Sequence, residues 1–177
     1  MTYVYSKEDY VIADKQKKNL VRTFFITLAV LLVVNIAVFV VYTQQEYQTP
    51  LKTPLLLANI LSCSIYFIVA YFFYAIKYKR VASYVKMLSD MQTGIRVEGV
   101  NTYVRTDSSI TVKDGVEFVS LIVLDWSEKK QEFFERAILW DLGKNIPDFK
   151  KGDVIKHITH ANIMFAYELA SNEIFEY

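Results

Sequence analysis

Residues 23–45 read TFFITLAVLLVVNIAVFVVYTQQ and carry no formal charge. As a helix, this stretch would be about 35 Å long at ~1.5 Å per residue, enough to cross a hydrocarbon core of ~30 Å. Residues 54–76 read PLLLANILSCSIYFIVAYFFYAI and are equally free of charge. Neither stretch shows the polar face that a helix on the surface of a soluble domain has at helical spacing. The two stretches therefore predict a pair of transmembrane helices.

The connection between them, residues 46–53, is short, so the helices are expected to form an antiparallel hairpin. The loop carries Lys52 alone, offset by Glu46. Eight basic residues flank the other ends, four before the first stretch and four after the second: Lys15, Lys17, Lys18, Arg22, Lys77, Lys79, Arg80 and Lys86. Basic residues gather on the cytoplasmic side of membrane proteins. We therefore expect a multi-pass protein of the cell membrane with both termini cytoplasmic.

The same basic residues would attract anionic lipid headgroups, although setting the topology is the role that we favour for them. Polar residues within the spans are few. Counted from the outer ends, Asn35 lies at about the depth of Ser62, and a hydrogen bond between them is expected to contribute about 0.6 kcal/mol. The alternative is that Asn35, with Asn59 and Ser62, faces another subunit. The spans contain no Asp, Glu, Lys, Arg or His, groups that proton and ion pathways normally need, which argues against a transporter acting alone.

The segments on either side of the hairpin are expected to be helical. Ser6-Lys7-Glu8-Asp9 has the Ser-x-x-acid form of a capping box and predicts a helix that begins near Lys7. Residues 77–92 lack Gly and Pro and form a helical neck that packs against the tail or against a second copy. The expected organisation is a cytoplasmic tail (1–22), a first transmembrane helix (23–45), an external loop (46–53), a second transmembrane helix (54–76), the neck (77–92) and a cytoplasmic β domain (93–177).

From Thr93 onward the hydrophobic pattern has a period of two, which is typical of strands. A phase shift at Gly99 predicts a bulge or sharp bend in the first strand, and residues 110–112 are expected to form a short strand of their own. Asp114-Gly115 predicts a hairpin turn. Further strands are expected at 118–126, 133–140, 154–159 and 163–169, with the first of these in the centre of the sheet because it is apolar on both faces.

Five or six short strands joined by hairpins predict a small antiparallel β-barrel or sandwich, of OB-like or SH3-like type. The fold class is accordingly membrane α+β: a two-helix transmembrane hairpin followed by this β domain. The layout is similar to that of the NfeD-like proteins, in which a membrane hairpin carries a small OB-type barrel. The similarity is one of architecture, and no residue motif of that family is carried over.

Four aromatic residues of the β domain are candidates for an interaction patch: Trp126, Phe133, Trp140 and Phe149. Exposed together, they would form a protein-binding surface. The interpretation that we favour is that the two tryptophans fill the core, since a domain of this size needs large side chains to fill its interior.

His157 and His160 are the only histidines, and with Asp153 they suggest a metal site whose spacing matches no strong zinc pattern. A structural or turn role is expected for both. The sequence contains no Gly-rich phosphate loop, no G-x-S-x-G and no Cys/His pair outside the apolar stretches. We therefore assign no catalytic residue, metal or cofactor, and the chain is not expected to be an enzyme.

Charge divides the chain in two: residues 1–90 carry ten Lys or Arg against five Asp or Glu, and residues 91–177 carry ten against fourteen. A nucleic-acid binder would concentrate positive charge on its folded domain, so nucleic acid is not an expected partner. The single cysteine, Cys63, excludes an intrachain disulfide. The expected function is a non-catalytic, membrane-anchored interaction or scaffolding subunit, in contact with lipids, that presents its β domain to another membrane protein or to its own copies. The alternative is an accessory subunit of a transporter, or a small homo-oligomeric channel.

Overall fold

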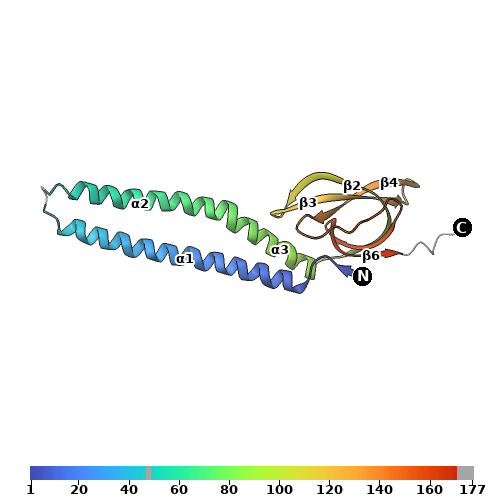
Figure 1. Cartoon of the computed structure of the whole chain (residues 1–177), viewed down its shortest axis with the longest axis horizontal. Coiled ribbons are helices and arrows are strands. Elements are labelled where there is room, and N and C mark those ends of the chain that lie inside the picture. The colour runs from blue at the N-terminus through green and yellow to red at the C-terminus, as the bar shows by residue number, and fades with distance from the viewer. Residues whose placement is uncertain (47–48, 171–177) are drawn as a thin grey trace. The chain divides into compact units, whose positions relative to one another are not determined.

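The structure is a computed structural model that describes residues 1–46 and 49–170. Residues 47–48 of the expected external loop and 171–177 of the expected β domain lie outside the described residues. The chain divides into two compact units (Figure 1). The hairpin unit comprises residues 14–82, and the β unit comprises residues 1–13 together with residues 83 onward.

Four helical segments make up the helical part of the chain: α1 (Lys7–Gln44), α2 (Lys52–Phe72), the π-helical turn η1 (Phe73–Tyr78) and α3 (Lys79–Thr93). Helix α1 begins where the sequence predicts, because Ser6 and Asp9 cap it reciprocally. The Asp9 amide donates to Ser6 Oγ at 3.2 Å and the Ser6 amide donates to Asp9 Oδ2 at 2.8 Å.

Helices α1 and α2 run side by side in the hairpin unit (Figure 1). The less exposed residues of α1 recur three or four positions apart, the spacing of two helices that pack along a narrow seam. They are Val21, Phe24, Leu28, Leu31, Asn35, Val38 and Tyr42. Outside this seam the apolar side chains are exposed, and no residue of α2 or η1 is buried. Both helices are long and apolar enough to span a membrane.

Five strands close into a barrel in the β unit: β2 (Val97–Lys113), β3 (Val116–Ser127), β4 (Glu132–Asp141), β5 (Val154–His160) and β6 (Ile163–Ala170). Their order around the barrel is β2-β3-β4-β6-β5 and back to β2. The pairs are antiparallel except β4 and β6, which meet in parallel at Leu139 and Ile163. A sixth strand, β1 (Thr2–Tyr3), pairs with β6.

Two details of the first barrel strand differ from the expectation. Gly99 pairs regularly with His157, and the register shifts lie further on, between Tyr103 and Arg105 and between Asp107 and Thr111. Gly99 is required by close packing, since an added Cβ would lie 2.8 Å from His157 Cε1. Residues 110–112 are not a separate strand. They form the end of β2, which is long because its first part pairs with β5 and its second part with β3.

Two tight turns connect barrel strands and have positive φ at both central residues. Asp114 and Gly115 have φ values of 52° and 77°, and Ala161 and Asn162 have values of 49° and 66°. Positive φ at both central residues matches the right-handed twist of the flanking strands. These turns fix the β2–β3 and β5–β6 hairpins.

The core of the β unit includes residues from outside the expected β domain (93–177). Phe118, Leu121 and Trp140 of the barrel are almost fully buried, and so are Leu88 and Met91 of α3. Val4 and Tyr5 of the N-terminal segment are buried as well. The neck from Ser83 onward and the first residues of the tail therefore belong to the same packed unit as the barrel.

Candidate functional site

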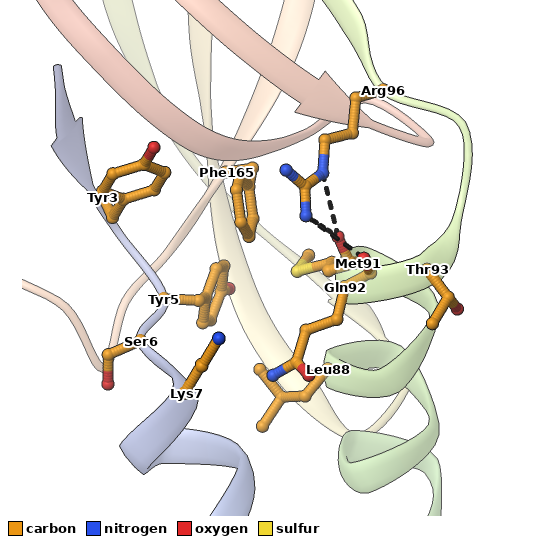
Figure 2. A pocket seen from close by; sticks show the side chains of 10 residues that line it. All are labelled: Tyr3, Tyr5, Ser6, Lys7, Leu88, Met91, Gln92, Thr93, Arg96 and Phe165. Atoms are coloured by element: carbon orange, nitrogen blue, oxygen red, sulfur yellow. Dashed lines mark hydrogen bonds between the residues drawn. The ribbon is translucent and has the colours of Figure 1, made fainter.

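A groove of about 570 Å³ opens in the β unit between the N-terminal segment, the end of α3 and strand β6 (Figure 2). It is lined by Tyr3, Tyr5, Ser6, Lys7, Leu88, Met91, Gln92, Thr93, Arg96 and Phe165. Strand β1 positions one wall: the Val4 amide donates to the Phe165 carbonyl at 2.9 Å, and the Tyr3 ring meets the Phe165 ring edge-on with centroids 5.7 Å apart. The groove thus depends on three segments that are far apart in the sequence.

Arg96 is fixed at one end of the groove. Its Nη2 donates to the carbonyl oxygens of Met91 at 3.1 Å and Gln92 at 3.3 Å, which are among the unpaired carbonyls at the end of α3. Its guanidinium lies over the Phe165 ring, 4.2 Å from the centroid. Both contacts are visible in Figure 2. A cation at a helix C-terminus also interacts favourably with the helix dipole, so Arg96 closes this end of the groove as a positioned cation.

Lys7 is the second cation of the groove. Figure 2 shows its side chain extending from the start of α1 between Tyr5 and Gln92. Its ammonium group makes no hydrogen bond or ion pair with the residues that the structure describes. The groove therefore combines aromatic and aliphatic walls with an ammonium group that is available to an incoming anion.

A polar clamp holds the N-terminal segment against the end of β4. Tyr5 Oη donates to Asp141 Oδ2 at 3.1 Å, and Lys144 Nζ contacts Asp9 Oδ1 at 2.8 Å. Burial raises the pKa of the Tyr5 phenol far above its ordinary value, and the neighbouring Asp141 raises it further. Burial also raises the pKa of Tyr84, to about 12. For Asp9, burial opposes ionisation, but the hydrogen bond from Lys144 outweighs it and the pKa is lowered.

Inside the barrel, His157 is buried against Asn101. Asn101 Nδ2 donates to the Leu124 carbonyl at 2.9 Å, so its Oδ1 accepts from His157 Nε2 at 2.7 Å. This assigns the ring proton to Nε2 and leaves Nδ1 buried without a partner among the described residues. Burial lowers the pKa of His157 to about 4, and the nearby Arg136 guanidinium acts in the same direction. His157 is therefore neutral at physiological pH.

The residues of the suggested metal site do not come together. His160 Nδ1 lies 2.8 Å from the Ile95 carbonyl oxygen, and Asp153 Oδ2 accepts from the Lys150 amide at 2.8 Å. Within residues 1–46 and 49–170, no group of three or more His, Cys, Asp or Glu side chains is arranged to hold a metal. His157 and His160 instead make separate contacts within the β unit.

The four aromatic residues of the candidate patch do not form one surface, and the core role that we favoured for both tryptophans holds for Trp140 but not for Trp126. Trp126 and Phe133 pair edge-on at the tip of the β3–β4 hairpin, with centroids 4.8 Å apart, and both are exposed. Trp140 and Phe149 lie in the core, with centroids 6.3 Å apart. The physical reason is register: β2 pairs with β3 only as far as Leu124, so Trp126 extends beyond the barrel.

The polar residues of the hairpin unit contact one another across the seam. Ser62 Oγ donates to Asn35 Oδ1 at 2.7 Å, as the depth count predicts, and Asn59 Nδ2 donates to the Asn35 carbonyl at 3.4 Å. Asn35 Nδ2 donates to the Leu31 carbonyl of its own helix at 2.8 Å. These side chains thus hydrogen-bond within one chain.

The basic residues that flank the spans precede the first apolar stretch or follow the second. Lys15, Lys17, Lys18 and Arg22 lie on α1, Lys77 on η1, and Lys79 and Arg80 on α3. Lys18 pairs with Asp14 at 2.7 Å on its own helix. Lys77 and Arg80 line a second pocket, in the hairpin unit, together with residues of α1.

Sequence reasoning missed the groove. The one local signal of the groove in the sequence is the alternation of Tyr3 and Tyr5 around Val4, which is too short to predict a strand. Comparison with protein-family models, curated proteins and solved structures finds no match for the chain. The chemistry of the groove is therefore the guide to function: it suits an apolar or aromatic group that carries a carboxylate close by.

Proposed function

We propose that the chain is a non-catalytic, membrane-anchored interaction subunit whose β unit binds a partner protein on the cytoplasmic side of the cell membrane. The hairpin unit serves as the anchor and the groove as the binding site. Each part of this proposal has its own support.

Exposed apolar surface supports membrane insertion. Val33, Phe67 and Tyr71 are each more than 65% exposed, and the apolar side chains continue around both helices outside the seam. Monomeric soluble proteins rarely expose contiguous apolar patches larger than a few hundred Å². In lipid the same surface is solvated by acyl chains, and the backbone groups are satisfied within each helix.

The distribution of basic residues supports the orientation. Eight basic residues flank the ends of the two apolar stretches that adjoin the β unit in sequence, against Lys52 alone in the connecting loop. Positive charge concentrates on the cytoplasmic side. The charge distribution therefore supports the proposal that both termini and the β unit are cytoplasmic.

For the barrel we propose the OB type. The order β2-β3-β4-β6-β5, closed by the β5–β2 pair and with β4 and β6 in parallel, supports this assignment. OB folds are five-stranded Greek-key barrels that use loops and one sheet face for binding. Here the groove lies elsewhere, beside the added strand β1.

The groove is the single observation that carries the proposal. It joins exposed Tyr3 and the Phe165 ring to the Lys7 ammonium. Aromatic residues are enriched at the centres of protein interfaces, and a charge-assisted hydrogen bond to a lysine adds specificity. A segment of another membrane protein that offers an apolar side chain beside an acidic residue would fit this chemistry. A second copy of the chain is the other candidate.

The alternative, an accessory transporter subunit or a homo-oligomeric channel, has less support. It requires Asn35, Asn59 and Ser62 to face a lumen or a neighbouring subunit. In the hairpin unit these side chains hydrogen-bond to one another across the seam. The exposed apolar flanks of the helices remain available for contact with a larger membrane protein.

The proposal can be tested by photo-cross-linking in native membranes. A photoreactive amino acid at Tyr3 of the full chain should give a discrete adduct on irradiation, and mass spectrometry should identify the attached protein. An adduct of twice the mass of the chain would identify self-association. Lys7→Glu should abolish the adduct by placing a carboxylate where the partner's acid binds.

Two controls accompany this experiment. Lys150→Glu changes the same charge at an exposed position outside the groove and should leave the adduct intact. The photoreactive residue at Trp126 reports on the aromatic pair at the β3–β4 tip. If Trp126 gives the adduct and Tyr3 gives none, the groove is not the binding site. If neither position gives one, the interaction role is wrong.

A further inference from the structure

A second pocket lies in the hairpin unit, between α1 and the segment formed by η1 and the start of α3. Its volume is about 410 Å³, within the range of small-ligand sites. Helix α1 contributes Gln16, Asn19, Leu20 and Thr23, and the other segment contributes Lys77, Arg80 and Val81. The lining residues therefore include two amides, a hydroxyl and two cations, although most of the pocket surface is apolar.

The charged side chains that line the pocket favour an anion. Its lining residues include two cations and no Asp or Glu. The Lys77 ammonium makes no hydrogen bond or ion pair with any residue that the structure describes. The nearest acid along α1, Asp14, is paired with Lys18 at 2.7 Å. An arginine and a lysine beside neutral donors form a typical phosphate-binding set.

The backbone at the pocket is unusual. The six residues of η1, Phe73–Tyr78, form a π-helical turn between two regular helices. Such turns are rare and occur frequently at functional sites. Before the turn, Phe73 stacks on Phe24 of α1 with centroids 5.8 Å apart. The wider turn changes the rotation of the residues after it, and Lys77, Arg80 and Val81 then face α1 across the pocket.

The sequence positions of the lining residues indicate that the anion belongs to a lipid. Thr23 is the first residue of the first uncharged stretch, and Lys77 directly follows the second. Tyr74 and Tyr78, in the same π-helical turn as Lys77, stack with centroids 5.4 Å apart. Tyrosine residues are enriched at the membrane–water interface. Phe25 on α1, Phe72 at the end of α2 and Ile76 in η1 are exposed and apolar. A molecule with its phosphate in the pocket would have its acyl chains along these side chains.

We propose that this pocket binds the phosphate headgroup of an anionic phospholipid. Lys77 and Arg80 bind the phosphate, Gln16, Asn19 and Thr23 donate to its oxygens or to the glycerol, and the acyl chains lie on the apolar surface of the hairpin. This inference rests on the proposed membrane placement of the hairpin unit but not on the partner-binding groove. It differs from a topology role for these cations because it assigns them one ligand in one place.

Native mass spectrometry of the full chain in neutral detergent tests the proposal. Phosphatidylglycerol should form a one-to-one adduct at concentrations at which phosphatidylcholine does not. Lys77→Gln and Arg80→Gln should each weaken the adduct about fivefold, the effect of one cation near an anionic lipid. The control pair Lys15→Gln and Lys17→Gln removes equal charge from the same basic region outside the pocket and should change binding less than about twofold.

Two further arms separate the possible explanations. Leu20→Trp fills the pocket while keeping both cations, and it should also abolish the adduct. Inorganic phosphate at the concentration of the lipid should not compete. Equal losses in the control pair, equal binding of phosphatidylcholine, an unaffected Leu20→Trp adduct or full competition by inorganic phosphate would each overturn the proposal. Helical circular dichroism at 222 nm confirms that every variant is folded, and recovery in phosphatidylcholine vesicles checks membrane placement independently.

Discussion

The hairpin unit exposes its apolar side chains, whereas the β unit buries many of its own. In the hairpin unit, valines such as Val33 are 68% exposed, while polar Asn35 lies in the seam between the helices. In the β unit, Leu121 and Ile155 are completely buried, while charged pairs such as Arg105 and Glu135 lie on the outside. The proposed membrane placement predicts this difference between the two units, which the overall hydrophobic fraction of 53% conceals.

The prediction with the largest expected effect compares the same change, valine to arginine, in the two units. Val33 and Val100 are both exposed, at 68% and 57%. In lipid, Val33→Arg places a charge near the centre of a span and should reduce membrane insertion by about 3 kcal/mol. In water, Val100→Arg should change stability by less than about 0.5 kcal/mol. The fraction of chain that resists carbonate extraction measures the first effect, and tryptophan fluorescence during urea unfolding measures the second.

Tryptophan fluorescence is well suited to this purpose because both tryptophans, Trp126 and Trp140, belong to the β unit. The signal therefore reports on that unit alone. If Val33→Arg inserts as well as the unmodified chain does, the hairpin unit is not in hydrocarbon and the contrast between the two units fails.

A smaller effect should come from the buried imidazole of the β unit. The pKa of His157 is lowered to about 4 in the folded chain, from an ordinary value of 6.5. Between these values the unfolded chain binds a proton that the folded chain does not, so stability falls as pH decreases through this window. From pH 7.5 to pH 5.0 the free energy of unfolding in detergent should decrease by about 1–2 kcal/mol.

His157→Gln should remove most of this pH dependence, whereas His160→Gln should retain it. The carboxylates of Asp9 and Asp125 do not obscure the effect, because their ordinary pKa of 3.8 already lies below pH 5.0. In the folded chain their pKa values are lowered further by Lys144 and Arg136, against the opposing effect of burial. Equal stability of the unmodified chain at the two pH values would show that His157 is not desolvated as described.

The smallest effect concerns the seam of the hairpin. Asn35→Leu removes the acceptor of the Ser62 hydroxyl, which keeps a second contact with the Asn59 carbonyl at 2.9 Å. The coupling energy between Asn35→Leu and Ser62→Ala should be about 0.6 kcal/mol, measured by a double-mutant cycle in detergent. Ser64→Ala is the control, since that hydroxyl bonds to Ile60 of its own helix. Zero coupling together with a change in oligomeric state would favour a contact between subunits.

Much of the fold could be predicted because its signals are strong and local. Lipid requires a minimum length and the exclusion of charge, so residues 23–45 and 54–76 stand out, and the Asp114-Gly115 turn has few alternatives. Strand β1 could not be predicted, since a two-residue strand carries almost no pattern. Its position depends on the edge of β6, which lies more than 160 residues away in the sequence.

The candidate site shows the same limit. Trp126 and Trp140 occupy similar settings in the sequence, yet one is 47% exposed and the other 1%. Their different burial depends on where the neighbouring strand ends. The register in which distant strands pair cannot be predicted from the sequence around either tryptophan. The groove likewise requires Lys7, Met91 and Phe165 to meet, which only the folded unit determines.

Labelling of single cysteines in intact cells tests the central claim most directly. Replacing Cys63 by alanine gives a background without cysteine, into which Thr49→Cys in the loop or Lys150→Cys in the β unit is introduced. A membrane-impermeant maleimide should label Thr49→Cys in intact cells and Lys150→Cys only after permeabilisation. Labelling of Lys150→Cys in intact cells would contradict the cytoplasmic placement. Recovery of both variants from the soluble fraction would contradict the membrane anchor itself.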